Sequence, residues 1–217
     1  MKTGTALAAM MVAGTAGWLG AMAWNTPAKS QSPRFALLTM ADLNDQQRPV
    51  GERIMKFSRA GIGGPYHIML RSPEGATRML DLLDYLRFHS SVPVRLNEFA
   101  ILIQGRLWRS QMEWWGHYPT ALKADVSAET LAELKANRRP TSMKPDEAAV
   151  YDFCMELYTT HQVSDPVYAR LKQYLNDQQI VDLTTVSGTY VAVASLLAMA
   201  EQGVPPGEPA AFGPNDP

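Results

Sequence analysis

The sequence of 217 residues contains a single cysteine, Cys154. An intrachain disulfide is therefore excluded, and so is redox chemistry that uses two thiols of the same chain. Cys154 stands beside Val150, Phe153 and Leu157 in a pattern typical of a helix. This apolar setting predicts a buried, unreactive thiol.

An excess of charge of one sign is also missing. Twenty Lys and Arg residues against 21 Asp and Glu residues give a net charge of −1, so nothing favours a nucleic acid or a membrane surface as partner. The His-x-x-x-His and Cys-x-x-Cys spacings and the glycine-rich phosphate loops are absent. We therefore expect no metal and no cofactor.

The sequence has no strand pattern of useful length and no repeat of fixed period, whereas helical periodicity recurs along it. The predicted fold class is all-α, a single bundle of seven to nine helices. Residues 41–202 form this predicted domain, after a linker over 24–40 that is rich in Ser, Pro, Gln and Ala. Residues 203–217, GVPPGEPAAFGPNDP, are predicted to be a disordered tail.

Residues 1–23 differ from the rest of the chain. They contain one early lysine, no other charge, and an apolar run that ends in Ala21-Met22-Ala23, which is typical of a secretory signal peptide. The protein is therefore expected to be exported, to the periplasm or the medium. If the segment is not cleaved, residues 5–23 would instead anchor the protein in the membrane.

The stretch 96–122 carries the candidate chemistry. Apolar residues recur in it at three and four positions and predict a helix with one buried face; they are Leu96, Phe99, Ala100, Ile103 and Leu107. After a predicted break near Arg109-Ser110, Glu113 and His117 lie one helical turn apart. A carboxylate at that spacing can hydrogen-bond the imidazole and fix its tautomer, as in general acid/base catalysis.

Glu98 lies in the first of these two helices and is the second candidate acid or base. A buried carboxylate must be paired or protonated, and such sites are often functional. A solvated helix face for Glu98 and a structural role for His117 are the alternatives. Arg106 is a candidate for gripping a substrate carboxylate through two hydrogen bonds, and Trp114 for walling a pocket around a planar ring.

The same residues resemble the carboxymuconolactone decarboxylase family, which is related to the AhpD alkylhydroperoxidases. The matching residues are Arg95, Glu98, Ala100-Ile101-Leu102, Arg106, Trp108, Glu113-Trp114 and His117. The similarity extends to Gly64–Glu74, Leu83–Phe88 and Val163–Leu171. In the AhpD branch the pattern is Glu, then Cys-x-x-Cys, then His; here Ser110 and Glu113 stand at the two cysteine positions.

The resemblance implies a cofactor-free, carboxy-lyase-like enzyme that acts on a small carboxylated lactone or related organic acid. Loss of CO₂ would leave a dienolate, to which His117, oriented by Glu113, would deliver a proton, with Glu98 as a second acid/base group. The resemblance also implies a homo-oligomer, a trimer or hexamer. An AhpD-like peroxidase and a non-catalytic binding module on the same fold are the alternatives.

Overall fold

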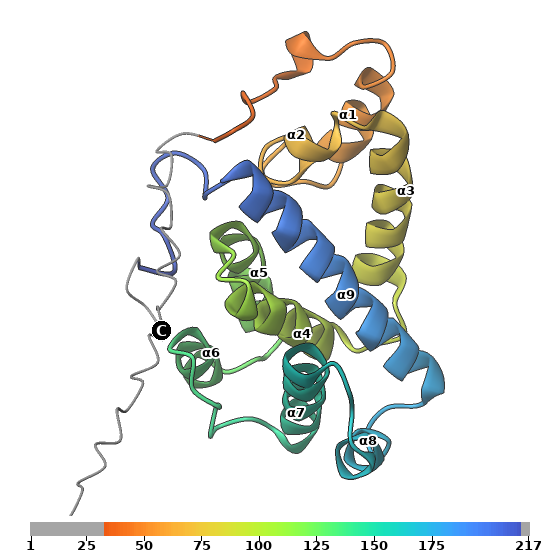
Figure 1. Ribbon diagram of the computed structural model, residues 1–217, viewed down its shortest axis with the longest axis vertical. Coiled ribbons are helices and arrows are strands. Elements are labelled where there is room, and N and C mark those ends of the chain that lie inside the picture. The colour runs from red at the N-terminus through yellow and green to blue at the C-terminus, as the bar shows by residue number, and fades with distance from the viewer. Residues whose placement is uncertain (1–32, 214–217) are drawn as a thin grey trace, which may run out of the picture.

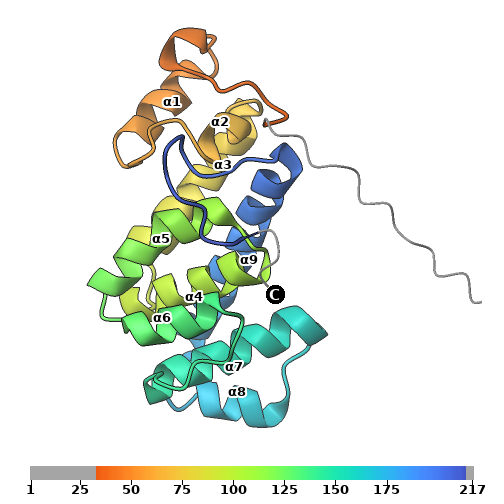
Figure 2. The same cartoon turned by 90° about the vertical axis from the view of Figure 1, so that its left-hand side faces the viewer.

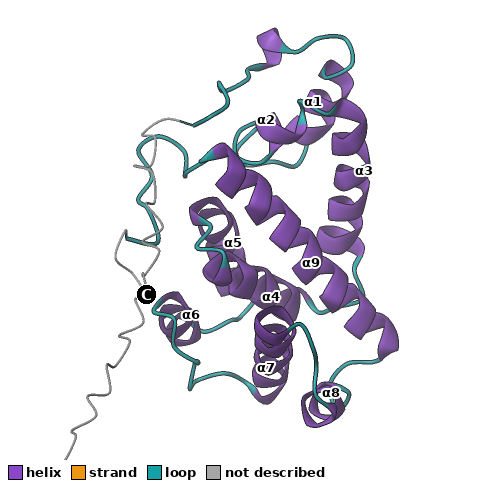
Figure 3. Cartoon of the chain, viewed as in Figure 1, coloured by secondary structure: helices purple, strands orange, loops and turns teal. Residues whose placement is uncertain are grey.

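The computed structural model of the protein describes residues 33–213, and these residues form nine α-helices and no strand (Figure 3). The predicted all-α class and helix number are confirmed. The α-helices are α1 (Arg48–Met55), α2 (Tyr66–Met69), α3 (Pro73–Asp84), α4 (Val94–Leu107), α5 (Gln111–Lys123), α6 (Ala128–Lys135), α7 (Pro145–Thr160), α8 (Asp165–Leu171) and α9 (Asp177–Ala200). A short 3₁₀ helix, η1 (Met40–Asp42), precedes α1, and a π-helix, η2 (Tyr85–His89), directly continues α3.

Helix α4 is the centre of the molecule. It packs against α5, α7 and α9, and Figure 1 shows it between α9 and the α5–α7 side of the bundle. Every residue from Leu96 to Arg106 is buried. The sequence predicted a helix with only one buried face; the structure differs because neighbours cover α4 on several sides. Its polar residues, Glu98 among them, are therefore forced into the interior.

Two groups of buried apolar side chains lie on the two sides of α4. Phe99, Leu102 and Ile103 pack into one group together with residues of α6, α7 and α9. Ile101 packs into the other, which is formed mainly by α1, α2, α3 and α9. Because α4 belongs to both, its position and rotation are fixed from both sides.

A tight turn joins α4 to α5, at the break that the sequence predicted. Arg109 takes up the left-handed conformation, with φ at 50°, and the backbone N–H of Ser110 donates to the carbonyl of Gly105 at 2.8 Å. The Ser110 hydroxyl then accepts from the N–H of Glu113 at the start of α5, which is a standard N-cap. A Cβ at Gly105 would lie 3.4 Å from the Cβ of Glu113, so α5 packs close to α4 at this point.

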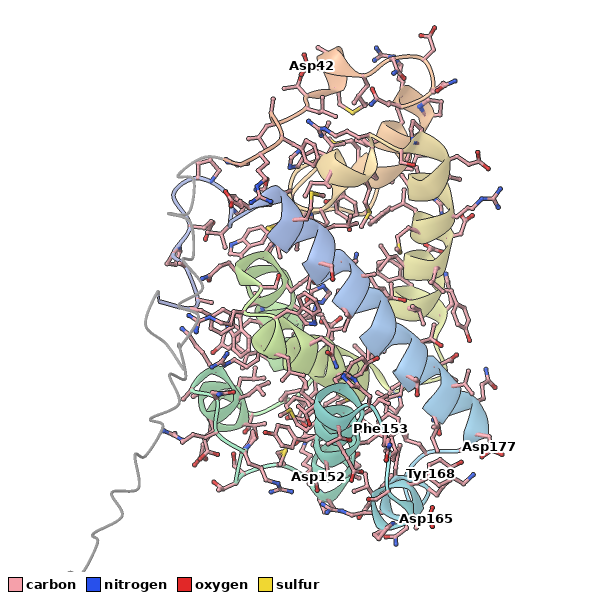
Figure 4. The ribbon with its side chains drawn as sticks, in the orientation of Figure 1. Asp42, Asp152, Phe153, Asp165, Tyr168 and Asp177 are labelled. Carbon is pink, nitrogen blue, oxygen red and sulfur yellow. The ribbon has the colours of Figure 1, made fainter. Side chains whose placement is uncertain are left out.

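The far end of the bundle, around α7 and α8, is held by polar contacts. Asp152 of α7 accepts hydrogen bonds from Arg139 and from Arg170 of α8, and Figure 4 shows Asp152 close to α8. Asn176 caps α9: its side chain accepts from the N–H of Gln179 at 2.9 Å.

The described part of the predicted tail, residues 203–213, has no helix, but it is held against the domain. It turns back from the end of α9 toward α5 (Figure 2). Phe212 is buried, its ring packs edge-on against Trp114, and its backbone exchanges two hydrogen bonds with the Gln111 side chain, at 2.6 and 2.9 Å. The disorder that was predicted from residue 203 onward does not extend to Phe212. The prolines and glycines disfavour a helix here, but the Phe212 ring and its backbone hydrogen bonds hold the segment against α5.

Helix α9 is long and apolar enough to cross a membrane by length and composition, yet half of its most apolar window is buried inside the fold. A core helix gives the same pattern. The predicted signal peptide and most of the predicted linker lie outside the described residues.

Candidate active site

The imidazole of His117 lies between two buried carboxyl groups. Its Nδ1 is 2.7 Å from Oε2 of Glu98 on α4, and its Nε2 is 3.6 Å from Oε2 of Glu113 one turn earlier on α5. All three residues are less than a tenth exposed. The structure therefore brings together the three residues that were predicted to be catalytic.

The partner that orients the ring differs from the prediction. Glu113 was expected to hydrogen-bond His117, but 3.6 Å is longer than a hydrogen bond, whereas the contact with Glu98 is short. An ionised carboxyl group only accepts, and with Glu98 in that form Nδ1–H of His117 is the donor of this hydrogen bond. The spacing of four residues puts Glu113 on the correct face, but α4 supplies the closer oxygen.

The Glu113 carboxyl group lies in a setting that favours its neutral form. Burial raises its pKa above the ordinary value, and the nearby charges of His117 and Arg87 only partly offset this rise. A protonated carboxyl group next to Nε2 can donate as well as accept. The imidazole thus has an acceptor on one side and a group that can hold a proton on the other.

A cavity of about 160 Å³ opens beside Glu113 and His117. Its walls come from the α1–α2 region, the end of α3 with η2, α5 and α9, and its polar lining residues include Ser58, Arg59, Tyr66, Arg87, Thr120 and Tyr190. Glu98 does not line it. Glu98 therefore lies behind the ring and positions it, while Glu113 and His117 face the space that a ligand can enter.

Two tyrosines add hydroxyl groups to the cavity wall. The Tyr190 ring meets the His117 ring edge-on, with centroids 4.9 Å apart. Burial raises the pKa of Tyr66 and raises that of Tyr190 well above its ordinary value. Both phenols therefore remain protonated near neutral pH and can donate hydrogen bonds to a ligand.

Arg87 is the cation of the inner wall. It is carried by η2, in which the helix widens for one turn, a form often found at functional sites. The Asn97 side chain of α4 donates to the carbonyl of Leu86 at 3.1 Å and so ties this turn to the helix that bears Glu98. Sequence reasoning missed Arg87, Tyr66 and Tyr190, because they come from three separate segments and no spacing links them to His117.

Arg106 and Trp114, the two predicted substrate-binding residues, are not among the side chains that line this cavity. The Arg106 guanidinium lies 5.3 Å from the centre of the Phe212 ring, and Trp114 stacks on Tyr118. Arg106 is eight residues from Glu98 along α4, a distance of about 12 Å. Trp114 is rotated from Glu113 by about 100° around α5. Both therefore face the C-terminal segment instead.

Cys154 is fully buried on α7, with its sulfur 3.7 Å from the Ser187 hydroxyl. Burial raises the pKa of this thiol to about 12, which agrees with the predicted unreactive state. Across residues 33–213, no group of three or more His, Cys, Asp or Glu side chains is arranged to hold a metal ion.

The fold resembles two solved structures. One is the alkylhydroperoxidase AhpD core of an uncharacterized peroxidase-related protein from Ralstonia eutropha JMP134, at 12% identity and a TM-score of 0.69, covering 80% of this chain and 93% of that one. The other is an uncharacterized peroxidase-related protein from Silicibacter sp. TM1040, at 14% identity and a TM-score of 0.65, covering 81% and 93%. No protein-family model matches the sequence, and no curated protein does. The chain therefore has the AhpD-like all-helical fold.

Proposed function

We propose that the cavity beside His117 is the active site of a cofactor-free acid/base enzyme that acts on a small carboxylated lactone or related organic acid, in the manner of a decarboxylase. The observation that carries the proposal is the pair of carboxyl groups on opposite ring nitrogens of one buried imidazole. A histidine that served only to fill the core would need one such partner. A second carboxyl group at the other ring nitrogen, beside a cavity, allows the imidazole to exchange protons with Glu113 and with a ligand.

In the proposed reaction, the bond between the substrate ring and its carboxylate breaks and CO₂ leaves. The electron pair of that bond passes into a dienolate conjugated with the lactone carbonyl. The dienolate carbon then takes a proton from Nε2 of protonated His117, whose charge is stabilised by the Nδ1–H bond to Glu98. The Glu113 carboxyl group returns a proton to Nε2, and solvent restores Glu113.

The size of the cavity suits a small substrate. Apolar cavities of about 150 Å³ hold one benzene molecule, and this one measures about 160 Å³. A single six-membered ring, or a short chain of similar bulk, therefore fits. This agrees with the single-ring acids that the sequence resemblance suggested.

The test is turnover of a panel of single-ring lactone acids, with CO₂ release as the measurement. His117→Ala and Glu113→Gln should each reduce turnover by more than about tenfold, since positioned acid/base groups contribute roughly 10² to 10⁴ in rate. Because the two residues are proposed to act as a unit, the double variant should be little worse than the worse single variant. Losses that simply multiply would show that they act separately.

A second candidate is an AhpD-like peroxidase, favoured by the descriptions of the two similar structures as peroxidase-related. That chemistry uses a reactive thiol, and the one thiol of this chain is buried, with a pKa of about 12, and is not part of the cavity wall. Peroxide turnover that is lost in Cys154→Ser would establish the peroxidase and overturn the decarboxylase. Tight binding of ring acids without any turnover would favour a binding module.

We also propose that the protein is exported and that it forms a trimer or hexamer. The N-terminal pattern of one lysine and an apolar run supports export. The resemblance to carboxymuconolactone decarboxylases supports the oligomer.

A further inference from the structure

We propose that Arg87 is the residue that recognises the substrate, by binding its carboxylate, and that the cavity selects single-ring or similarly small monoanions over neutral molecules of the same shape. This inference rests on the proposed function in taking the cavity beside His117 as the substrate site. It assigns to Arg87 the role that the sequence suggested for Arg106.

The first argument is that the Arg87 guanidinium lies 5.0 Å from the centre of the Phe88 ring but has few hydrogen-bond acceptors around it. Its Nε atom is shielded from solvent and has no hydrogen bond within the described part of the chain. Nη1 donates to the Tyr66 hydroxyl at 3.5 Å, at the long limit for a hydrogen bond. Guanidinium offers five N–H donors, and Arg87, which is half-buried, has donors left to bind an anion that enters the cavity.

Carboxyl groups lie near Arg87 but not against it. Burial by itself lowers the pKa of Arg87, but its neighbours, Tyr190, Tyr66, Glu98 and Glu113, outweigh this and raise it. None of the ion pairs formed within residues 33–213 includes Arg87, although ten other basic side chains there are paired with carboxylates. Arg87 and Glu113 both line the cavity.

The other arginine of the cavity wall, Arg59, is already in use. Pro119 lies inside α5 and has no N–H for the carbonyl of Trp115, four residues earlier. Arg59 donates to that carbonyl at 3.3 Å, and its guanidinium lies 4.4 Å from the centre of the Trp115 ring. Arg59 therefore supplies the hydrogen bond that the Trp115 carbonyl lacks within α5. An Arg59 variant is thus a matched control for the Arg87 variants, since both arginines line the cavity.

The positions of Arg87, Glu113 and His117 also determine how a bound acid would be oriented in the cavity. Its carboxylate would lie against Arg87, within reach of the Tyr66 hydroxyl, and its ring would extend toward Glu113 and His117 on the α5 wall. Guanidinium binds a carboxylate through two parallel hydrogen bonds, which fixes the orientation as well as the charge. A group other than the one held by Arg87 would then face the imidazole.

The experiment measures binding rather than turnover. Benzoate and 2-furoate, each compared with its neutral amide, are titrated into the full-length protein by isothermal calorimetry. The wild type should bind each acid about ten- to a hundredfold more tightly than its amide, the range expected of hydrogen bonds to a charged group. Arg87→Gln should bring acid and amide within about threefold of each other, while Arg59→Gln should keep the wild-type preference.

Arg87→Lys decides the question if Arg87→Gln does not fold. It keeps the charge but loses the two-pronged geometry, so its preference should fall by several-fold; an unchanged preference overturns the proposal. The proposal is also overturned if the wild type binds acid and amide equally well, or if Arg59→Gln loses the preference for the acid. His117→Ala should keep the preference of the wild type for the acid over the amide. If this variant also retains full turnover, the proposed function is refuted, whereas the role of Arg87 in binding is not.

Discussion

Replacing Glu113 by glutamine is expected to stabilise the protein at alkaline pH while it inactivates the site. Glutamine keeps the size of the side chain but cannot ionise. Glu113 is 4% exposed, and burial raises the pKa of its carboxyl group from its ordinary value of 4.5, against the lowering effects of His117 and Arg87. At pH 8 the wild type must therefore carry a buried charge, or hold a proton that the unfolded chain has already lost.

The sign and size of the effect depend on proton binding. Between the unfolded and folded pKa values of Glu113, the folded state binds more protons, so the free energy of unfolding falls as the pH rises. The contribution of the protonated group is complete below pH of about 4.5 and is lost as the pH rises through the folded pKa. One proton gives a slope of at most about 1.4 kcal/mol per pH unit, and glutamine gives none.

Urea denaturation, followed by circular dichroism between pH 5 and pH 8 at one protein concentration, measures the difference. The free energy of unfolding of Glu113→Gln minus that of the wild type should grow with pH and level off above the folded pKa. Glu74→Gln, which removes a carboxylate whose side chain is 82% exposed, is the control. A difference that stays constant from pH 5 to pH 8 for Glu113→Gln would refute the reasoning.

Four further results are expected. Cys154→Ser should leave turnover nearly unchanged, and the native thiol, with its pKa of about 12, should resist alkylation at pH 8; rapid labelling of the folded protein would contradict this. Phe212→Ala should lower the free energy of unfolding by about 3 kcal/mol, the usual loss for a buried phenylalanine, and an unchanged urea midpoint would mean that the tail contributes little. The intact mass of protein from its native host should lack residues 1–23, whereas a full-length mass in the membrane fraction would indicate an anchor. Light scattering after size-exclusion chromatography should give a trimer or hexamer, and a monomer at micromolar concentration would refute that proposal.

Local patterns predicted the parts of the site that lie close together in the sequence. The spacing of Glu113 and His117 and the break at Arg109-Ser110 are properties of a single helix and a single turn, and the structure contains both. Glu98 was predicted as a catalytic candidate, but its hydrogen bond to His117 depends on how α4 and α5 pack. That packing joins residues 19 positions apart in the chain, and a helical periodicity does not reveal it.

Contacts between residues far apart in the chain explain which site residues the sequence analysis missed and which it placed incorrectly. Tyr66, Arg87 and Tyr190 belong to three different helices. They line one cavity only in the folded structure. Arg106 was chosen for its charge and its place in a family pattern, yet helix geometry turns it toward Phe212. The tail looked disordered because composition predicts backbone order but not the docking of one side chain.

The π-helix under Arg87 has a consequence for how such a site can arise and disappear. A π-turn accommodates one more residue than the α-turn that it replaces, so its presence depends on the number of residues between α3 and Ser90, more than on their identity. Deleting one residue within 85–88 would let the helix continue regularly, and the residues before the deletion would rotate by about 100° relative to the residues after it. Glu98, Glu113 and His117 lie outside this segment, on α4 and α5. A single deletion is thus expected to move the cation away from the cavity wall without any substitution at Glu98, Glu113 or His117.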